Sequence, residues 1–559
     1  MSLYNLTLVA AGLVALGVYL TSSVARRRMR DVDGLPRPPR ESWLFGNLPQ
    51  LFLPQNYGDH EFGWQAEYGD VYVIHGVLGQ SRMMVSDPAA LNHLLRNDDV
   101  HLAPMMLALG RSLFGRDNAM ALRDASHRKL RAALNLGFAP AVVKGYLETF
   151  ESVARGITTA LDLGDGQEGS VVDISEPLST ATLSAISQGP RAHSGSFRRS
   201  AGRRADTGEH FNPVECLSSP RTLIASIRSP SAEADRFGRA QFVAEAMAPY
   251  LPAPFLDWMF GLPLPMFAAI RRAYELARKI EDQAIQDLAQ SEDSNERSFE
   301  HLYAKILAQN SKRALSPDEL AMQTNLVLIA GQDTTANTLA FALTELARQP
   351  ALQDALRGEI RKARLEPATD YDSLPLLNAV IKEALRLLPA EPIGDKIAHV
   401  DLTLPLSRPV TLSDGRVVDQ LFVPKGQLVG LAFAGYQRGG TRWGPEPEAF
   451  NPYRWIEGKV GVSEPMATSP YAHLLAFSNG GDLRERYCLR LTTVLNPALH
   501  CRSILEMQVI LAELVPKFVF KIPDDPALAM RFRFANTLMP CNDKGEKRAW
   551  LAVERVQDL

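Results

Sequence analysis

The sequence predicts a mainly α-helical protein with small β-sheets, an α+β architecture, behind a single N-terminal transmembrane helix. First, Leu3 to Ala25 is almost wholly apolar and uncharged, and it is about as long as the roughly 20 residues that a helix needs to cross a membrane. Second, a helical pattern of about 32 residues runs from Pro317 to Arg348. Third, short strand-forming runs lie beside turn signals such as Ser413-Asp414-Gly415 and Pro424-Lys425-Gly426.

The bulk composition excludes several classes of protein. The chain has 559 residues, of which 46% are hydrophobic, so it can fill a sizeable core. Its formal net charge of -3 gives no electrostatic basis for nucleic-acid binding, and we expect no nucleic-acid partner. The four cysteines form neither a disulfide framework nor a zinc pattern, which indicates a reducing compartment. They are Cys216, Cys488, Cys501 and Cys541.

The N-terminal stretch is expected to be a retained membrane anchor. Four arginines between Arg26 and Arg30 follow the apolar residues, whereas a secretory signal carries its positive charge before them. Because positively charged flanks stay cytosolic, Met1 is expected in the lumen and the rest of the chain in the cytosol. A buried core helix is disfavoured, since such helices seldom lack a polar face. We assign residues 1–30 to the anchor and its basic flank, and 31–50 to a proline-rich hinge that acts as a spacer.

The first part of the folded region is expected to combine a hairpin with helices. Strand-forming residues between Gly69 and Asp87 predict a β-hairpin, and Pro88 to Arg96 predicts the short helix after it. Arg123 to Leu136 reads as a basic helix in which His127 and Arg131 stand four apart and share a face. Taken alone, this pair favours a solvated helix face over an anion-binding site.

The long helix from Pro317 to Arg348 has a polar centre. Its flanks are apolar, but Gly331, Asp333 and Thr334 lie in the middle. A central glycine costs about 1 kcal/mol relative to alanine, and buried polar groups without partners cost more. A water-filled polar kink would explain this pattern. The functional interpretation is a groove opened at Gly331 for a small ligand, with the Thr334 hydroxyl and the Asp333 carboxylate placed to relay protons.

A charged pair lies on a later, otherwise apolar helix. Glu383 and Arg386 stand three apart and can pair, although such a pair is usually on the surface. Arg454 follows in an irregular loop, Phe450-Asn451-Pro452-Tyr453-Arg454-Trp455, among aromatic neighbours. A second buried guanidinium would share the carboxylate of Glu383, because buried charge persists only when it is paired.

The ordered series of these features resembles the cytochromes P-450, the haem-thiolate monooxygenases, in their microsomal fungal form. The series comprises the anchor, the proline hinge, the A-G-x-D-T-T helix, the E-x-x-R helix, the P-x-R loop and an F-x-x-G segment beginning at Phe477. The resemblance covers the chain from Leu3 to about Phe520, except for residues 189–236 and 481–502. It implies the P-450 fold, with residues 51–559 as the haem monooxygenase domain.

The resemblance also implies roles for individual residues. Asp333 and Thr334 look like the oxygen-activating acid and alcohol, and Gly331 like part of the cofactor groove. Glu383, Arg386 and Arg454 look like a structural ion triad, and His127 and Arg131 match the helix position that contacts a haem propionate.

The same resemblance implies the cofactor and the partners. The cofactor is haem b (heme b), and the substrates are O2 and a lipophilic small molecule. No dinucleotide-binding or flavin segment is visible in the sequence, so electrons are expected from a separate membrane-bound NADPH-dependent reductase. The expected location is the endoplasmic reticulum membrane, with a single span and a cytosolic catalytic domain.

The haem-ligand loop departs from the family pattern F-x-x-G-x-R-x-C-x-G. Phe477 lies 29 positions before Glu506, which is longer than the pattern allows. Cys488 keeps R-x-C but lacks the glycine two positions later, while Cys501 lies closer to the final helix but lacks the arginine two positions before it. Either cysteine could ligate the iron. One hypothesis is that residues 481–502 are translated intron or a mispredicted exon, and the Arg- and Ser-rich loop or disordered insert at 189–236 could share that origin.

Three functions compete on the sequence alone. The first is an endoplasmic-reticulum monooxygenase that oxidises a lipophilic small molecule, such as a terpenoid or another secondary metabolite. The second is a non-catalytic relative, a membrane scaffold or pseudogene product, whose haem-ligand loop is disrupted. The third, an anchored serine hydrolase, is disfavoured because the chain contains no G-x-S-x-G motif.

Overall fold

The computed structural model describes most of the chain after the predicted anchor. Besides the single residues 122, 126 and 130, the described ranges are 30–114, 143–162, 170–187, 242–261, 317–366, 370–439, 441–458, 474–476, 496–535 and 537–557. The predictions for the membrane span, for the insert at residues 189–236 and for His127, Arg131 and Cys488 therefore lie outside them. Within the described ranges, no helix is both long enough and apolar enough to cross a membrane.

The largest sheet has five strands in the order β1-β2-β8-β5-β3. β1 (Val71–His75) and β2 (Ser81–Val85) form the predicted hairpin, with Val71 opposite Val85, and α5 (Pro88–Arg96) is the predicted helix after it. Both predictions are confirmed. The other three strands come from distant parts of the chain: β3 (Val100–Leu102), β5 (Ile393–Ala398) and β8 (Leu428–Ala432).

Three smaller sheets complete the β-structure. β6 (Leu402–Thr411) pairs with β7 (Val417–Val423) across the Ser413-Asp414-Gly415 turn. The strands β4 (Ser170–Asp173), β12 (Trp550–Arg555) and β9 (Phe518–Lys521) form a sheet in that order. β10 (Arg531–Ala535) pairs with β11 (Thr537–Cys541).

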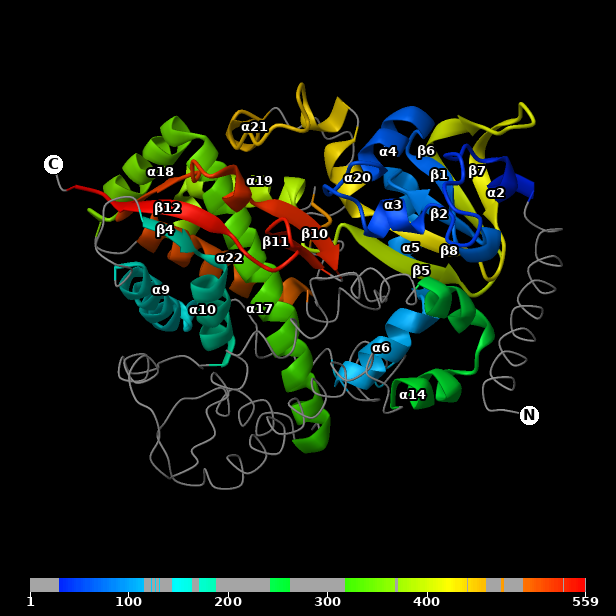
Figure 1. The fold of residues 1–559 in the computed structure, drawn as a ribbon, viewed down its shortest axis with the longest axis horizontal. Coiled ribbons are helices and arrows are strands. Elements are labelled where there is room, and N and C mark those ends of the chain that lie inside the picture. Colours follow the sequence, from blue (N-terminus) through cyan, green and yellow to red (C-terminus); the bar gives the residue numbers. More distant parts are fainter. Residues whose placement is uncertain are drawn as a thin grey trace.

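The centre of the structure is α17 (Pro317–Arg348), a helix of 32 residues that crosses the molecule diagonally in Figure 1. Proline at its first position suits a helix start, and the next proline, Pro350, begins a new helix. The predicted length is confirmed. Its main helical neighbours are α10 (Ser175–Ser187), α18 (Pro350–Ala363), α19 (Pro375–Leu387) and α22 (Asn496–Leu514). A further helix, α9 (Leu147–Asp162), packs against α10 and α22.

Shorter helices connect and cover these elements. The α-helices are α2 (Arg30–Gly34), α3 (Leu48–Phe52), α4 (Glu61–Tyr68), α6 (Pro104–Phe114), α14 (Ala253–Gly261), α20 (Phe433–Arg438) and α21 (Tyr453–Ile456). The 3-10 helices are η1 (Val77–Gly79), η2 (Ala248–Tyr250), η4 (Tyr371–Ser373), η5 (Thr441–Trp443) and η6 (Pro526–Leu528).

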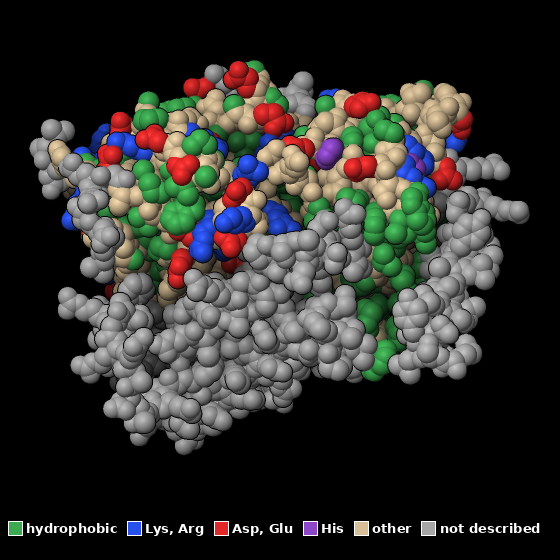
Figure 2. Space-filling model, viewed as in Figure 1, with side chains coloured by type: hydrophobic (Ala, Val, Ile, Leu, Met, Phe, Trp, Pro, Cys, Tyr) green, Lys and Arg blue, Asp and Glu red, His purple; other side chains and the backbone are tan. Residues whose placement is uncertain are grey.

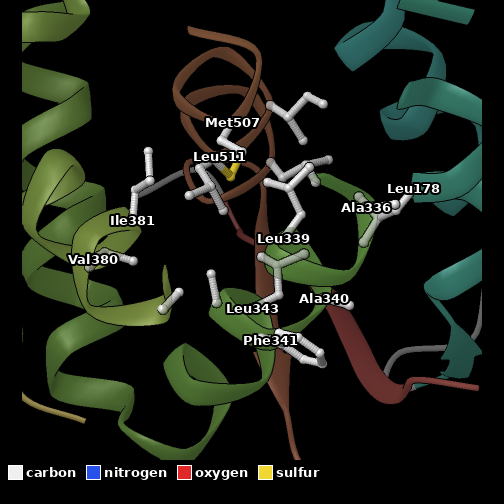
Figure 3. Packing of buried hydrophobic residues seen from close by; sticks show 14 of the residues in the cluster. Leu178, Ala336, Leu339, Ala340, Phe341, Leu343, Val380, Ile381, Met507 and Leu511 are labelled. Carbon is white, nitrogen blue, oxygen red and sulfur yellow. The ribbon is translucent and has the colours of Figure 1, made fainter. Parts of the chain in front are cut away.

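The main hydrophobic core lies where α17 meets α19 and α22. Leu339 and Leu343 of α17 are buried beside Met507 of α22 and Val380 of α19 (Figure 3). Burial of each side chain of this size contributes about 1.5–3 kcal/mol. This core fixes the C-terminal half of α17 and so sets the position of its polar centre.

The proline-rich segment, predicted as a stiff spacer between membrane and domain, packs against the domain at its start. Val32 and Leu35 are buried in a cluster that includes strands of the largest sheet, and Asp31 forms an ion pair with Arg416 at 2.9 Å. The spacer prediction missed this because it weighed the prolines and ignored the two apolar side chains, whose burial ties the segment to β6 and β7.

A second buried feature is a polar cluster between α4 and α20. Glu61 lies near Arg438 and near the hydroxyls of Tyr57 and Tyr72. Within the described part of the chain, Oε1 of Glu61, both tyrosine hydroxyls and Nε of Arg438 are buried without a hydrogen-bond partner. Burial raises the pKa of the Glu61 carboxyl from 4.5 to about 8, and Arg438 opposes the shift. Glu61 is therefore protonated in the folded protein at neutral pH.

We predict that Glu61 makes the folded protein less stable as the pH rises. Between about pH 5 and pH 8 the folded state keeps a proton that the unfolded state releases, so stability falls by up to about 1.4 kcal/mol per pH unit. Glu61→Gln should remove this slope and be more stable than wild type at pH 8. Urea unfolding at pH 5, 6.5 and 8 measures it. Glu67→Gln, an exposed position on the same helix, is the control, and equal slopes in Glu61→Gln and wild type would contradict the prediction.

Candidate active site

The polar centre of α17 is partly exposed, unlike the residues that follow it. Ala330 and Thr334, one turn apart, and Gln332 and Asp333 between them are partly exposed, whereas the helix is buried from Thr335 to Leu343. The Thr334 hydroxyl donates to the Ala330 carbonyl at 2.7 Å. Ala330 and Thr334 share one face of the helix, and the hydroxyl is its polar group.

Gly331 does not open onto this face. A Cβ atom at this position would meet Cδ1 of Ile186, on α10, at 2.2 Å. The glycine therefore allows α10 and α17 to approach closely, a common reason for glycine inside a helix. On the side of Gly331 itself, Ile186 of α10 therefore occupies the space next to the helix. The partly exposed face of Ala330 and Thr334 points in a different direction around the helix axis.

Asp333 points away from that face, toward α10 and the C-terminal region. Its Oδ1 accepts a hydrogen bond from Lys547 Nζ at 2.8 Å, and the same Nζ donates to Ser179 Oγ at 3.0 Å. The sequence analysis did not identify Lys547. No local pattern marks it, because it reaches α17 from a turn more than 200 residues further along the chain.

The start of α22 places three consecutive residues against three different neighbours. Cys501 is exposed and lies near Asp372 of η4, Arg502 is buried over the rings of Tyr146 and Phe150, and Ser503 lies 3.4 Å from Thr335 of α17. Only the serine faces α17.

Cys501 has an acidic neighbour. Burial raises the pKa of the Cys501 thiol, and the Asp372 carboxylate raises it further. A metal ion bound at the thiol would act in the opposite direction, because coordination deprotonates a thiol. The rival cysteine of the sequence analysis, Cys488, lies outside the described residues.

Arg502 and Glu506 form a separate buried ion pair on α22. Arg502 Nη1 donates to Glu506 Oε2 at 2.9 Å, and the two side chains are almost completely buried. Burial raises the pKa of the Glu506 carboxyl to about 7, and Arg502 opposes the shift. The pair anchors α22 against α9, on the side that faces away from α17.

Glu383, Arg386 and Arg454 come together in the structure as one buried group. Arg386 donates through Nε to Glu383 Oε2 and through Nη2 to Oε1, both at 2.9 Å, and Arg454 Nε donates to Oε1 at 2.9 Å. Trp455 Nε1 and the Asn451 backbone N–H add bonds of 2.8 and 2.9 Å. Five donors therefore satisfy a carboxylate that is fully buried, which is the condition for keeping charge inside a protein.

The same group also fixes the chain that enters the haem-ligand loop. Arg386 Nη1 donates to the Gln437 carbonyl at 2.9 Å, and the Gln437 side chain donates to the carbonyls of Leu385 and Arg386. Its Oε1 accepts from the backbone N–H of Leu475 at 2.6 Å. Leu475 lies two residues before Phe477, so the ion triad is connected to the start of the loop through one glutamine.

Of the residues that the sequence assigned to the haem, the structure describes Gly331 and Cys501. Beside Gly331, Ala330 and Thr334 are partly exposed, and Thr334 carries a hydroxyl. Cys501 lies on α22 near Asp372. The remaining residues that the sequence assigned to the cofactor, Cys488, His127 and Arg131, lie in parts of the chain that the structure does not describe.

We predict that Glu383→Gln destabilises the fold severely. The substitution leaves two buried guanidinium groups without a carboxylate, and breaking a buried ion pair in this way costs about 3–5 kcal/mol. Urea unfolding measures the loss. The control is Arg155→Ala, which removes an exposed helix pair with Glu151 and should cost less than about 1 kcal/mol. Equal losses of unfolding free energy in both variants would show that the triad contributes no more to stability than an exposed ion pair does.

Comparison with known proteins identifies the family. A model of the cytochrome P-450 family, described as "Cytochrome P450", matches residues 36–190 and 225–489. The cytochrome P-450 monooxygenase 81 of Postia placenta is 28% identical over 529 residues, which cover 92% of this chain and 91% of that protein. The cytochrome P-450 monooxygenase claU of Ampulloclitocybe clavipes is 26% identical over 518 residues, which cover 89% of this chain and 88% of that protein. The chain therefore belongs to the cytochrome P-450 family, and its similarity to these relatives over most of its length makes it a haem-dependent monooxygenase.

Proposed function

We propose that the protein is a membrane-bound monooxygenase that oxidises a lipophilic small molecule, such as a terpenoid or another secondary metabolite, with O2 and electrons from an NADPH-dependent reductase. The observation that carries the proposal is the accessible face at the centre of α17, where Ala330 and Thr334 lie beside Asp333 in an otherwise apolar helix. A hydroxyl on a partly exposed face, with an acid at the neighbouring position of the helix, suits oxygen chemistry on an apolar substrate.

Each group at this face has a distinct task. When bound, the haem would supply the iron that activates dioxygen, and a cysteine thiolate holding the iron would favour cleavage of the O–O bond. The Thr334 hydroxyl, now bonded to the Ala330 carbonyl, can turn to hold a proton beside the reacting oxygen. Asp333 is the acid that can replace that proton from the solvent side. The apolar core beyond Leu339 keeps bulk water away from the C-terminal side of the site.

We assign the axial thiolate to Cys488. It keeps the R-x-C spacing of the family, with Arg486 two positions before it. Cys501 is the weaker candidate because it lacks the arginine two positions before it, where Leu499 stands. The assignment requires residues 481–502 to be present in the protein. The family match has a gap at residues 191–224, inside the other atypical segment, and it ends at residue 489, inside the loop. Sequencing the transcript tests whether both segments are present.

Absorption spectroscopy tests the ligand. The protein, reduced and exposed to carbon monoxide, should show the red-shifted band of a thiolate-ligated haem. Cys488→Ser should lose this band because serine supplies no thiolate, and Cys501→Ser should keep it.

The three possible failures have different meanings. Loss of the band in Cys501→Ser alone would move the ligand to that cysteine. Absence of the band in the wild-type protein would instead favour the second function, a non-catalytic relative whose ligand loop is disrupted. Recovery of the band after removal of residues 481–502 and restoration of the family motif would identify the loop as the defect.

The proposed location is the endoplasmic reticulum membrane, with the catalytic domain in the cytosol. Besides the apolar N-terminal stretch, the domain exposes large apolar side chains around η1, η2 and α14. Trp43 and Trp258 are 75% and 58% exposed. The loop that carries Trp43 is joined to η1 by one hydrogen bond, which the Leu78 backbone N–H donates to the Leu44 carbonyl at 2.8 Å. Hydrophobic side chains are visible in this part of the surface in Figure 2, on the right-hand side. The exposed large apolar side chains of this region are Trp43, Leu78, Tyr250, Phe255 and Trp258.

We predict two separable contributions to membrane binding. The wild-type protein should remain in the membrane pellet after alkaline carbonate extraction, and a variant that lacks residues 3–25 should be released. That variant should still bind neutral lipid vesicles at neutral pH through the exposed side chains, and adding Trp43→Ser and Trp258→Ser should weaken this binding. Val417→Ser, at an exposed apolar position on β7, is the control. Release of the wild-type protein by carbonate would contradict the anchor.

A further inference from the structure

Glu391 carries a carboxyl group that the fold does not pair. It lies in the short connection between α19 and β5. Within the part of the chain that the structure describes, no hydrogen bond and no ion pair reaches this carboxyl. Glu383, by contrast, accepts bonds from five donors. A buried carboxylate keeps its charge only when it is paired, so the structural role of Glu383 does not extend to Glu391.

The backbone on both sides of Glu391 is fixed. The Ala390 carbonyl accepts from the Leu538 backbone N–H of β11 at 2.7 Å, and the Pro392 carbonyl accepts from the Ala434 N–H of α20 at 3.0 Å. Because Glu391 precedes a proline, its own backbone is biased toward extended conformations. The side chain therefore projects from a short, rigid segment.

The same segment is joined to the face of α17 that carries Thr334. Asn337, three residues after Thr334, donates through Nδ2 to the Leu538 carbonyl at 3.0 Å, and residues three apart on a helix share a face. Phe341, one turn further along, packs edge-on against Phe532 of β10, with ring centroids 5.3 Å apart. The β10–β11 hairpin therefore follows this face of α17 and connects it to the α19–β5 connection.

Glu391 lies deep among protein atoms and is nevertheless accessible. Burial raises the pKa of its carboxyl from 4.5 to about 7, Lys396 opposes the shift, and Asp395 adds to it. The residue is partly exposed, whereas Ala390 and Ile393 on either side are buried. A carboxyl that is largely desolvated and still accessible can obtain its missing partner from a bound molecule.

The neighbouring charges favour a positively charged partner. Arg82 Nη1 lies 3.0 Å from Asp395 Oδ1, and Arg82 Nη2 lies 3.5 Å from Glu245 Oε2, so both of these acids already have a cation. Lys396 acts on Glu391 through its charge but forms no ion pair with it. Of these three carboxyl groups, that of Glu391 is the one without an ion pair.

We propose that Glu391 binds a protonated amine of the substrate, so that the enzyme selects lipophilic molecules that carry a basic nitrogen at one end. The inference rests on the proposed function, because it takes the Thr334 face as the place where the substrate is oxidised. An ammonium group has donors and no acceptor, which complements a carboxylate that lacks donors. Hydrogen bonds between charged partners are stronger than those between neutral ones. The carboxylate holds the charged end, and the apolar remainder extends along the Thr334 face.

Equilibrium dialysis of the purified full chain tests the site without any turnover. The probes are N,N-dimethyldecylamine, a cation at neutral pH, and 1-decanol, which is uncharged, in the same detergent throughout. At pH 8, Glu391→Gln should weaken binding of the amine by about tenfold or more. Binding of decanol should change by less than about twofold, because the amide keeps the size of the side chain and loses only its charge.

Two further variants serve as controls. Asp401→Asn, at an exposed position between β5 and β6, removes the same charge at a distance from the site and should keep both wild-type dissociation constants. Glu391→Asp keeps the carboxylate and should retain a preference for the amine over decanol. Urea unfolding of each variant confirms that it is folded.

The pH dependence of binding gives a second readout. The cation binds the carboxylate form of Glu391, which gains population as the pH rises through about 7. The affinity of the wild-type protein for the amine should therefore rise between pH 6 and pH 8. In Glu391→Gln it should stay constant, as should the affinity of both proteins for decanol.

The outcomes separate this inference from the proposed function. An unchanged affinity for the amine in Glu391→Gln, or an equal loss of affinity for amine and decanol, would overturn the cation site and leave the monooxygenase intact. Absence of the carbon monoxide band from the wild-type protein would overturn the proposed oxidation. A selective loss of amine binding in Glu391→Gln would support the cation site even then, because dialysis requires no turnover.

Discussion

The fold depends on one buried carboxylate, that of Glu383. It lies between two buried guanidinium groups and accepts five hydrogen bonds from α19, from α21 and from the residues before α21. Burial lowers the pKa of Arg386, and Glu383 opposes the shift. An ion group of this kind adds little net stability compared with apolar packing, but it tolerates no missing member. Its contribution is positional, because it joins α19 to the loop beyond α20 and, through Gln437, to the chain that enters the haem-ligand loop.

The catalytic side of the site has a different origin, which is packing. Leu339 and Leu343 fix the C-terminal half of α17 in the main core, and Gly331 lets Ile186 of α10 approach the helix. Together these contacts set the rotation of α17 about its own axis. That rotation leaves Ala330 and Thr334 partly exposed and turns Asp333 toward Lys547. A rotation by one residue, about 100°, would point Asp333 where Thr334 now points.

The sequence predicted those parts that local patterns encode. The β1–β2 hairpin, α5 and the full length of α17 follow from strand periodicity and from prolines at helix ends. The buried partners of Glu383 could be anticipated because a buried charge needs opposite charge nearby. By contrast, Lys547 and Ile186 reach α17 from distant segments with no local signal, and burial of Val32 and Leu35 depends on a sheet that forms about 400 residues later in the chain. The hydrophobic periodicity of the sequence does not predict such tertiary contacts.

The haem-ligand loop affects the fold and the activity differently. Its entry is fixed by the hydrogen bond from Leu475 to Gln437, and its exit by Ser503 beside Thr335. With both ends fixed, extra residues between them cost only a slowly increasing closure entropy. The surrounding fold can therefore form around a long loop. A thiolate that must meet one iron atom has no such tolerance, because each added residue widens the set of positions that Cys488 can occupy. The A-G-x-D-T-T, E-x-x-R and P-x-R motifs lie outside this segment, although the family match extends into it as far as residue 489. The chain can therefore keep these motifs and still depend on the loop for its activity.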